Sequence, residues 1–353
     1  MIRKQYILTL LAAAAFLCVC CGKAPQTTPE TPPEVEPESF FCKGADISWV
    51  TEMEKNGYKF YNAAGQEREL TALMKELGCN AIRLRVWVNP EGGWNGQADV
   101  VAKAKRAQAL GLKLLIDFHY SDSWADPGTQ NVPAAWQGKD AAAMTAAVKA
   151  HTQEVLQALK SAGVEVAWVQ VGNETTNGML WDSGKVAGSS VGQFVSYFHA
   201  GREAVKAVYP QAQVILHLDN GWNLSTLNWF LGLMKSRSLD YDILGLSLYP
   251  SYWENGAYPD WTPKVQQFVN NLPTLYQNYG KPVLLVEFGM PASEPAKAKA
   301  ALQYLMQNTQ KLDYFQGIFY WEPESEKSRN GYDYGAFSGG SPTAALDPFS
   351  RSR

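Results

Sequence analysis

The chain has 353 residues, which is enough for one large barrel domain or two ordinary ones. Its 31 basic and 34 acidic residues give a formal charge of −3, and the absence of a strongly basic block argues against phosphate-rich partners such as nucleic acids. Aromatic residues make up 12% of the chain, with 12 Trp and 17 Tyr, which favours a large core and also a cleft for flat sugar rings.

The N-terminal segment predicts export. Arg3-Lys4 precedes an apolar run, Tyr6 to Val19, that is too short to span a bilayer and matches a secretory signal. The following Cys20-Cys21 resembles the end of a bacterial lipoprotein signal, with Cys21 as the lipidated residue and Cys20 as the alternative. We therefore expect residues 1–21 to be a signal peptide and the protein to be lipid-anchored, at the bacterial cell surface or the periplasmic face of the outer membrane. An ordinary cleaved signal is the alternative.

Residues 22–39 contain the sequence KAPQTTPETPPEVEPES, which is rich in Pro, Glu and Thr and has almost nothing to bury. This composition predicts a disordered tether, so we expect the folded domain to occupy residues 40–353. Two cysteines remain in that domain, Cys42 and Cys79, near the starts of two neighbouring predicted strands. Either a disulfide or two buried free thiols fits these positions. No spacing typical of metal ligands, such as CxxC or HExxH, occurs in that domain.

From Phe40 onward, short apolar runs alternate with amphipathic stretches. The runs predict strands at Gly44–Ser48, Ala81–Val88, Leu112–Phe118, Glu165–Val171, Gln213–Leu218, Tyr241–Leu248, Pro282–Val286 and Phe315–Tyr320. The stretches between them predict helices at Glu67–Leu77, Ala98–Leu110, Ala141–Ala162, Phe194–Val208, Leu224–Lys235, Lys264–Tyr279, Ala296–Lys311 and near Pro342–Leu346. Eight such units predict an α/β fold, a single (β/α)8 TIM barrel. A doubly wound open sheet is the alternative, but it normally carries a Gly-rich loop after its first strand, and none is present.

Two of the predicted strands end in a glutamate, Glu174 after the fourth and Glu287 after the seventh. Carboxylates at the C-terminal ends of barrel strands occupy the usual catalytic face, and such a pair is typical of glycosidases. The acid of the pair must hold its proton, so burial or a negative neighbour should raise its pKa. The nucleophile must stay ionised, and Arg83 and Tyr249 are the candidates to stabilise its charge.

Other polar and aromatic residues follow the predicted strands. The amide of Asn173 is placed to bind a sugar hydroxyl, while His119 and His217 are candidates to orient other groups or to bind sugar. Trp124, Trp222 and Trp321 are candidates for stacking on sugar rings, and Trp124 and Trp321 are favoured because they follow strands directly.

Four stretches resemble glycoside hydrolase family 53, the endo-β-1,4-galactanases. They are IRLRVWVNP at 82–90, DFHYSDSWADP at 117–127, GNE at 172–174 and HLDNGW at 217–222. The similarity runs from about Gly44 to Trp321. The Asn173-Glu174 pair, taken alone, is shared by the wider clan of retaining barrel glycosidases.

The resemblance implies a retaining (β/α)8 enzyme that cleaves β-1,4-galactan, including type I arabinogalactan, without a catalytic cofactor. It implies that Glu174 is the acid/base and Glu287 the nucleophile. It further implies substrate binding by residues around the cleaved sugar and along the cleft, namely Asp46, Arg83, Trp124, Asn173, His217, Tyr249 and Trp321. From its place after the third strand, His119 is also expected to bind substrate. Some bacterial relatives bind a structural calcium ion in a long loop near the end of the barrel. Here the segment from Glu322 to Phe337 is short and no ligands match.

Two other functions fit the same residues. One keeps the chemistry but acts on another β-1,4-glycan such as mannan. The other is a non-catalytic, glycan-binding surface lipoprotein, against which the presence of both glutamates argues.

Overall fold

The computed structural model describes residues 40–350. The predicted signal peptide, the lipidation of Cys21 or Cys20 and the predicted tether lie outside the described residues. Within the described part of the chain, no helix is long and apolar enough to cross a membrane.

Eight parallel strands form a closed barrel in the order β1-β10-β9-β8-β7-β6-β5-β4, with β10 pairing β1 to close the ring. Their bounds are β1 Cys42–Asp46, β4 Ala81–Val86, β5 Lys113–Phe118, β6 Trp168–Val171, β7 Gln213–Leu218, β8 Ile243–Leu248, β9 Val283–Phe288 and β10 Phe315–Trp321. The predicted (β/α)8 barrel is therefore confirmed, and the open sheet is excluded because the sheet has no edge.

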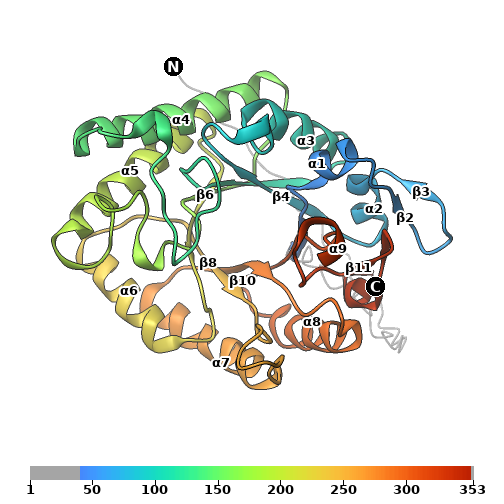
Figure 1. Cartoon of the computed structure of the whole chain (residues 1–353). Coiled ribbons are helices and arrows are strands. Elements are labelled where there is room, and N and C mark those ends of the chain that lie inside the picture. The colour runs from blue at the N-terminus through green and yellow to red at the C-terminus, as the bar shows by residue number, and fades with distance from the viewer. Residues whose placement is uncertain (1–39, 351–353) are drawn as a thin grey trace, which may run out of the picture. The chain divides into compact units, whose positions relative to one another are not determined.

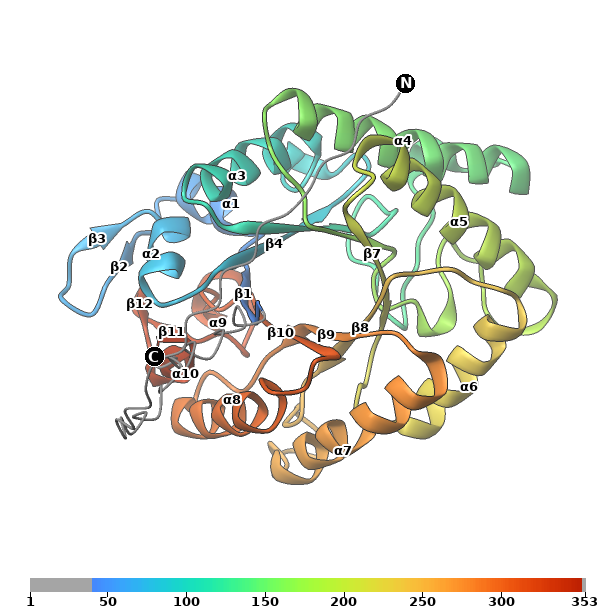
Figure 2. The same ribbon diagram turned by 180° about the vertical axis from the view of Figure 1, so that it is seen from behind.

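Helices surround the strands, and the two opposite views of the molecule show them as an outer ring (Figures 1 and 2). Their bounds are α1 Val50–Lys55, α2 Leu70–Glu76, α3 Gln97–Ala109, α4 Ala141–Ser161, α5 Val191–Val208, α6 Leu224–Ser236, α7 Thr262–Tyr279 and α8 Pro295–Thr309, followed by the short α9 Lys327–Asn330 and α10 Asp347–Ser350. The long helices each bury an apolar stripe against the barrel, as their sequence spacing predicts.

The first βα unit differs from its prediction. The expected helix Glu67–Leu77 loses its first residues to a hairpin, β2 Phe60–Tyr61 with β3 Glu67–Arg68, because Glu67 and Arg68 pair with β2. The helix then begins after Glu69, whose carboxylate accepts from the backbone N–H groups of Thr71 and Ala72. Helix α1 was not predicted, since six residues are too few to show a helical period. A second small hairpin, β11 Phe337–Ser338 with β12 Ser341–Pro342, lies near the C-terminus.

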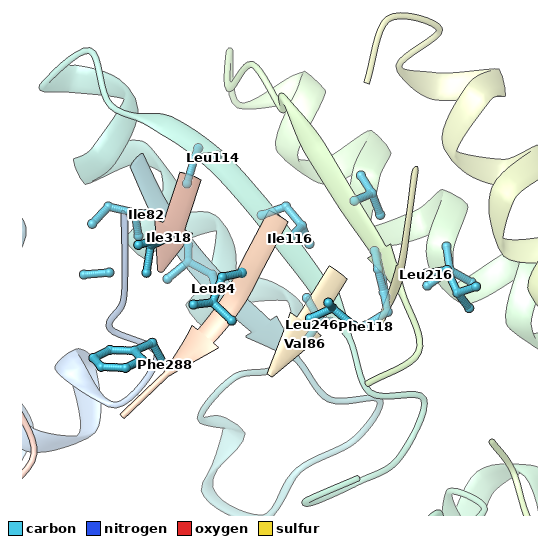
Figure 3. Packing of buried hydrophobic residues seen from close by; sticks show 14 of the residues in the cluster. Ile82, Leu84, Val86, Leu114, Ile116, Phe118, Leu216, Leu246, Phe288 and Ile318 are labelled. Atoms are coloured by element: carbon cyan, nitrogen blue, oxygen red, sulfur yellow. The ribbon is translucent and has the colours of Figure 1, made fainter. Parts of the chain in front are cut away.

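Side-chain alternation along the strands produces two layers of core. The outward-facing residues pack against the helices, as the apolar residues of β4 and β5 labelled in Figure 3 illustrate, namely Ile82, Leu84, Val86, Leu114, Ile116 and Phe118. A separate buried cluster consists of the inward-facing residues nearer the strand starts, among them Ala81, Leu115, Trp168, Ile215 and Phe319. The inward positions nearer the strand ends carry polar groups instead, including Arg83, Asp117 and Gln170. The barrel interior is thus apolar near the starts of the strands and charged near their C-terminal ends. The charged layer supports the site.

An irregularity in β9 turns Glu287 into the barrel. Along the β8–β9 pairing, Leu246 faces Leu285 but Ser247 faces Glu287, so one residue of β9 is skipped. The same extra residue appears against β10, where Ile318 faces Leu285 and Tyr320 faces Phe288. Strict alternation would point Glu287 away from the interior that Val286 occupies. The bulge lets both side chains lie inside, a use of bulges that is common beside active sites.

Candidate active site

A cavity of about 670 Å³ lies at the C-terminal ends of the barrel strands. Both predicted catalytic residues, Glu174 and Glu287, line it. Around them are residues from the ends of five strands and the segments that follow them, namely His119, Trp124, Ala125, Asp126, Pro127, Asn173, Asp219, Asn220, Trp222, Ser247, Tyr249, Tyr252, Glu254, Lys264, Trp321 and Tyr332. The two carboxyl groups therefore face one common space.

Glu287 is held by a cation and a hydroxyl. Arg83 Nη2 lies 2.9 Å from Glu287 Oε1, and Tyr249 donates its hydroxyl to Glu287 Oε2 at 2.9 Å. Gly289 makes the second contact possible, because a Cβ there would lie 2.6 Å from the Tyr249 ring. Two strong donors on one carboxylate favour its ionised form.

Arg83 shares its donors among several acceptors. Its Nη1 donates to Asp46 at 2.7 Å, while Nη2 lies 2.8 Å from Asp117 and within 3.3 Å of the side-chain oxygens of Asn173 and Gln170. Nη2 carries only two hydrogens, so these acceptors and Glu287 cannot all be bound fully at once. The arginine can therefore follow a change of charge on Glu287 by redistributing hydrogen bonds, without moving.

Within residues 40–350, no Lys or Arg forms an ion pair with Glu174, although Lys264 lines the same cavity. It follows β6 with φ 45° and ψ 54°, a left-handed conformation that is uncommon outside glycine and costs roughly 1–3 kcal/mol. Tyr120, Asn220 and Glu322 also have positive φ just after barrel strands, so the strain gathers at this face. The Glu174 carboxyl accepts one hydrogen bond from Ser247.

The two glutamates differ in how strongly they retain a proton. Burial raises the pKa of Glu174 well above its usual range, and the negative charges of Glu287 and Asp219 raise it further. Burial also raises the pKa of Glu287, but Arg83 and the Tyr249 hydroxyl oppose that effect. As the pH rises, the pair therefore loses its first proton mainly from Glu287 and its second mainly from Glu174.

His217 lies behind Glu174 in one definable tautomer. Its Nδ1 receives two N–H donors, the Gln170 amide at 2.9 Å and the Glu174 backbone at 3.2 Å, so Nδ1 is the acceptor. The proton then sits on Nε2 and is donated to Ser247 Oγ at 2.7 Å. Burial and the charge of Arg83 lower the pKa of His217 well below its usual value, which keeps the ring neutral. The ring thus directs the Ser247 hydroxyl towards Glu174.

Asn173 and His119 are oriented by their own neighbours. The Asn173 side-chain oxygen accepts from Arg83 at 3.0 Å, and its Nδ2 donates one hydrogen to the Ala125 carbonyl at 2.7 Å, which leaves a second N–H available at the cavity wall. His119 Nδ1 accepts from Trp87 at 3.3 Å and from the Ala125 backbone at 3.2 Å, so its Nε2–H donates to Asp117 at 3.0 Å.

An aromatic wall borders the cavity on the side of Trp124 and Trp321. We use this name for Trp49, Trp124, Trp321 and Tyr332. Their ring centroids lie 4.6–5.9 Å apart in successive contacts, and Trp124 is 37% exposed. The buried guanidinium of Arg85 lies 4.4 Å from the Trp124 ring centre and 4.9 Å from that of Trp49, within cation–π range.

Arg85 is in turn paired with a buried glutamate, and a second buried glutamate lies near the first. It forms an ion pair with Glu322, whose other oxygen accepts from the Trp49 backbone N–H at 3.2 Å. Glu324 is fully buried near Glu322, and neither of its carboxyl oxygens has a hydrogen-bond partner among the described residues. A buried carboxyl group without a donor or a cation is more stable in its neutral form. Burial and the charge of Glu322 raise the pKa of Glu324 well above its usual range, so Glu324 keeps its proton.

Three of the predicted substrate-binding residues do not reach the cavity. Asp46, Arg83 and His217 are fully buried, whereas His119, Trp124, Asn173, Tyr249 and Trp321 line it. The buried three are strand residues, Asp46 on β1, Arg83 on β4 and His217 on β7, with partners crossing the barrel interior. The structure places these three behind the residues that line the cavity, where they contact and orient them. Trp222, the less favoured stacking candidate, does line the cavity.

Sequence reasoning missed Gln170 and Ser247. Gln170 contacts Arg83, Asp117, Asn173 and His217. A signal existed for Gln170, because it is the single polar residue within a buried apolar strand. Ser247 had no such signal, since a serine near the end of a strand is common in any barrel.

The predicted alternatives for the cysteines are resolved in favour of free thiols. Cys42 and Cys79 are both buried and unpaired, and burial raises the pKa of Cys79 to about 12. Within residues 40–350 no group of three or more His, Cys, Asp or Glu side chains could hold a metal ion.

Comparison with known sequences shows which family the chain resembles. Residues 42–311 match the description "Glycosyl hydrolase family 53". The chain is 33% identical over 305 residues to a probable arabinogalactan endo-β-1,4-galactanase A of Neosartorya fischeri, covering 80% of this chain and 83% of the relative. It is 33% identical over 307 residues to an arabinogalactan endo-β-1,4-galactanase of Humicola insolens, covering 80% of this chain and 89% of the relative.

Structure comparison agrees. A solved structure from a study of two fungal β-1,4-galactanases superimposes with a TM-score of 0.80 and 30% sequence identity, over 89% of this chain and all of the other. The family match covers most of the chain, and the relatives are covered nearly in full. The chain therefore belongs to glycosyl hydrolase family 53 and is a glycoside hydrolase.

Proposed function

We propose that this chain hydrolyses β-1,4-galactosidic bonds within galactan or type I arabinogalactan, with retention of anomeric configuration. Glu287 is the nucleophile and Glu174 the acid/base. The observation that carries the proposal is the unequal environment of the two carboxyl groups around one cavity. Glu287 has a cation and a hydroxyl donor, whereas Glu174 has negative neighbours and no ion-pair partner in the described part of the chain. Similarity to the galactanases of Neosartorya fischeri and Humicola insolens supports the choice of substrate.

The reaction follows from these two states. Glu174 gives its proton to the glycosidic oxygen while Glu287 attacks the anomeric carbon, and the C–O bond to the leaving sugar breaks. When the covalent glycosyl ester forms, Glu287 loses its negative charge, and Arg83 Nη2 is free to strengthen its bonds to Asn173 and Gln170. Glu174, now ionised, takes a proton from water. The resulting hydroxide equivalent attacks the anomeric carbon, and Glu287 is released with retention.

Two side chains are placed to assist the transition state. The free N–H of Asn173 faces the cavity, where it can bind the hydroxyl next to the anomeric carbon, a contact that strengthens as the ring becomes oxocarbenium-like. The Tyr249 hydroxyl keeps one lone-pair direction of Glu287 occupied, so the attacking oxygen is fixed.

The choice between galactan and mannan depends on the shape of the chain. The C4 hydroxyl is axial in galactose and equatorial in mannose, so a β-1,4-linked galactan bends differently along a cleft. The test is the release of reducing ends from galactan, mannan and cellulose at equal concentration. We expect activity on galactan, with a spread of intermediate product lengths at early times. Activity on mannan alone would overturn the galactan proposal, and a single short product from the start would overturn internal cleavage.

We propose further that the protein is exported and lipid-anchored through Cys21. The support is the apolar run ending in Cys20-Cys21 and the Pro-rich residues that follow it. Metabolic labelling with a fatty acid in a bacterial host should mark the wild type but not Cys21→Ala. Labelling that is lost only in Cys20→Ala would move the anchor to Cys20, and an unlabelled wild type would indicate an ordinary cleaved signal.

A further inference from the structure

The segment after β8 carries two adjacent large aromatic side chains that are exposed to water, and the first of them lines the cavity. Tyr252 is 58% exposed and Trp253 is 52% exposed, and both follow the site residue Tyr249 closely in sequence. Tyr252 also lines the cavity that contains Glu174 and Glu287. Exposed aromatic groups that continue a binding cleft need an explanation, since burying them would otherwise stabilise the fold.

The backbone beneath these rings is a fixed turn. Glu254 and Ala257 exchange two backbone hydrogen bonds of 3.0 Å across Asn255-Gly256, which have φ of 51° and 82°. Positive φ at both central residues of an Asn-Gly pair is the signature of a type I′ hairpin turn. Ser251 donates to the Pro259 carbonyl at 2.5 Å, which closes the base of the segment.

Three contacts attach this turn to the segment after β10. The backbone N–H of Trp253 donates to the Tyr334 hydroxyl at 2.8 Å, and the Tyr258 hydroxyl donates to Asp333 at 2.9 Å. The Tyr252 ring stacks on Tyr334 with a centroid distance of 5.1 Å and an interplanar angle of 2°. Trp253 meets Tyr258 edge-on at 4.8 Å. Tyr252 and Trp253, which we call the aromatic rim, are thus exposed but held in place.

We propose that the aromatic rim is an outer sugar-binding subsite, which holds units of the polysaccharide beyond those that occupy the catalytic cavity. Galactose suits such a surface, because its axial C4 hydroxyl leaves the C–H groups at C3, C4 and C5 together on the opposite face. A ring that is already fixed loses little side-chain entropy when a sugar stacks on it. The cavity runs from Glu287 to Tyr252 without a break, so the occupant is the same chain that is cleaved.

The proposal rests on the proposed galactanase function, and its test separates the two. The substrates are linear β-1,4-galacto-oligosaccharides of increasing length, labelled at the reducing end, and the readout is which bond is cut and at what kcat/KM. The variants are Tyr252→Ala, Trp253→Ala and the double change. The backbone hydrogen bond of residue 253 survives these changes, so the turn is retained. Trp229→Ala is the matched control, because Trp229 is 50% exposed but lies on α6 and does not line the cavity.

Each ring removed should lower kcat/KM for the longer oligosaccharides by about 2- to 10-fold, as expected for one aromatic stacking contact. The preferred cleavage position should move along the chain, while the shortest substrates and the Trp229→Ala control stay unchanged. An unaltered cleavage pattern in the double variant would overturn the subsite. A loss seen only on polymer, with every oligosaccharide unaffected, would also overturn it, because the rim would then be separate from the cleft. If the wild type cuts no galacto-oligosaccharide at all, the proposed function fails first.

Discussion

Arg83 and Arg85 lie two residues apart on β4, and both guanidinium groups are fully buried inside the barrel. Each binds one glutamate directly, Arg83 to Glu287 and Arg85 to Glu322. Each cluster also contains a second glutamate, which has no ion-pair partner among the described residues and a pKa raised well above its usual range. This second glutamate is Glu174 in one cluster and Glu324 in the other. The two clusters therefore have the same electrostatic design.

What differs is access. Glu174 and Glu287 line the cavity, whereas Glu322 and Glu324 are fully buried and do not line it. Shifted pKa values alone would nominate both clusters as active sites. The comparison teaches that a proton-holding glutamate pair is reactive only where a substrate can reach it, and that the sealed pair supports the aromatic wall instead.

The largest effect should follow from weakening the Arg83 cluster. Arg83→Lys keeps the charge but loses the planar fork that reaches Asp46, Asp117 and Glu287 together. We expect kcat to fall by about 100- to 1,000-fold with little change in KM, as for the loss of one fixed group that stabilises a transition state. Steady-state kinetics on galactan, with thermal unfolding to verify the fold, give the measurement. A kcat within threefold of wild type would contradict the role of Arg83.

The same kind of change in the Arg85 cluster should act on binding. Arg85→Met fills a similar volume but removes the cation beneath Trp124 and Trp49, so the wall loses its anchor. A cation–π contact is worth about 0.5–2 kcal/mol, so we expect KM to rise roughly 5- to 10-fold while kcat changes less than about threefold. Tryptophan fluorescence should change as well. A kcat loss comparable to that of Arg83→Lys would remove the distinction between the clusters.

A smaller effect is expected on the pH dependence of activity, which the pKa of Glu174 controls. The negative charge of Asp219 raises the pKa of Glu174, so Asp219→Asn should lower it. Activity requires protonated Glu174, so the alkaline limb of the kcat/KM profile should move to lower pH. The control is Asp240→Asn, because Asp240 precedes β8 and lies at the opposite end of the barrel. A limb that stays in place would exclude Glu174 as the titrating acid.

The smallest effect concerns stability alone. The pKa of Glu324 is raised in the folded state, so above pH 4.5 the unfolded chain releases a proton that the folded chain keeps. The folded state therefore loses stability as the pH rises from that value, and this loss is absent in Glu324→Gln, because the amide does not titrate. The melting temperature of the variant minus that of wild type should grow as the pH rises above 4.5, with kcat unchanged. A difference independent of pH would mean that Glu324 carries no proton.

Much of the scaffold was predictable from sequence because strand alternation and helical spacing are local signals. The eight barrel strands agree with their predictions to within a few residues, and Glu174 and Glu287 were recognisable as carboxylates that interrupt apolar runs. The features that the sequence did not predict are either very short or depend on residues distant in the chain. Helix α1 is too brief for a period, and the β9 bulge that lets Val286 and Glu287 both face inward depends on the neighbouring strands.

The Arg85 cluster shows the same limit. Glu322 was visible as a polar residue after the last strand, but its pairing with Arg85 and the proton on Glu324 arise only from burial. Likewise, Asp46, Arg83 and His217 resemble substrate ligands in sequence, yet they lie behind the cavity wall. A sequence motif identifies which side chains come together at the site. Whether each one is buried or lines the cavity is determined by the three-dimensional packing of the closed barrel.

The most direct measurement traps the covalent intermediate. A galactobioside with fluorine at C2 of the reacting sugar and a dinitrophenolate leaving group should form the glycosyl ester quickly and hydrolyse slowly, because fluorine destabilises the oxocarbenium-like transition states while the leaving group accelerates the first step. Mass spectrometry of the digested protein should find the added sugar on Glu287, with Glu174 unmodified. An intact enzyme that turns over galactan but carries no label, or one labelled on Glu174, would contradict the assignment of nucleophile and acid.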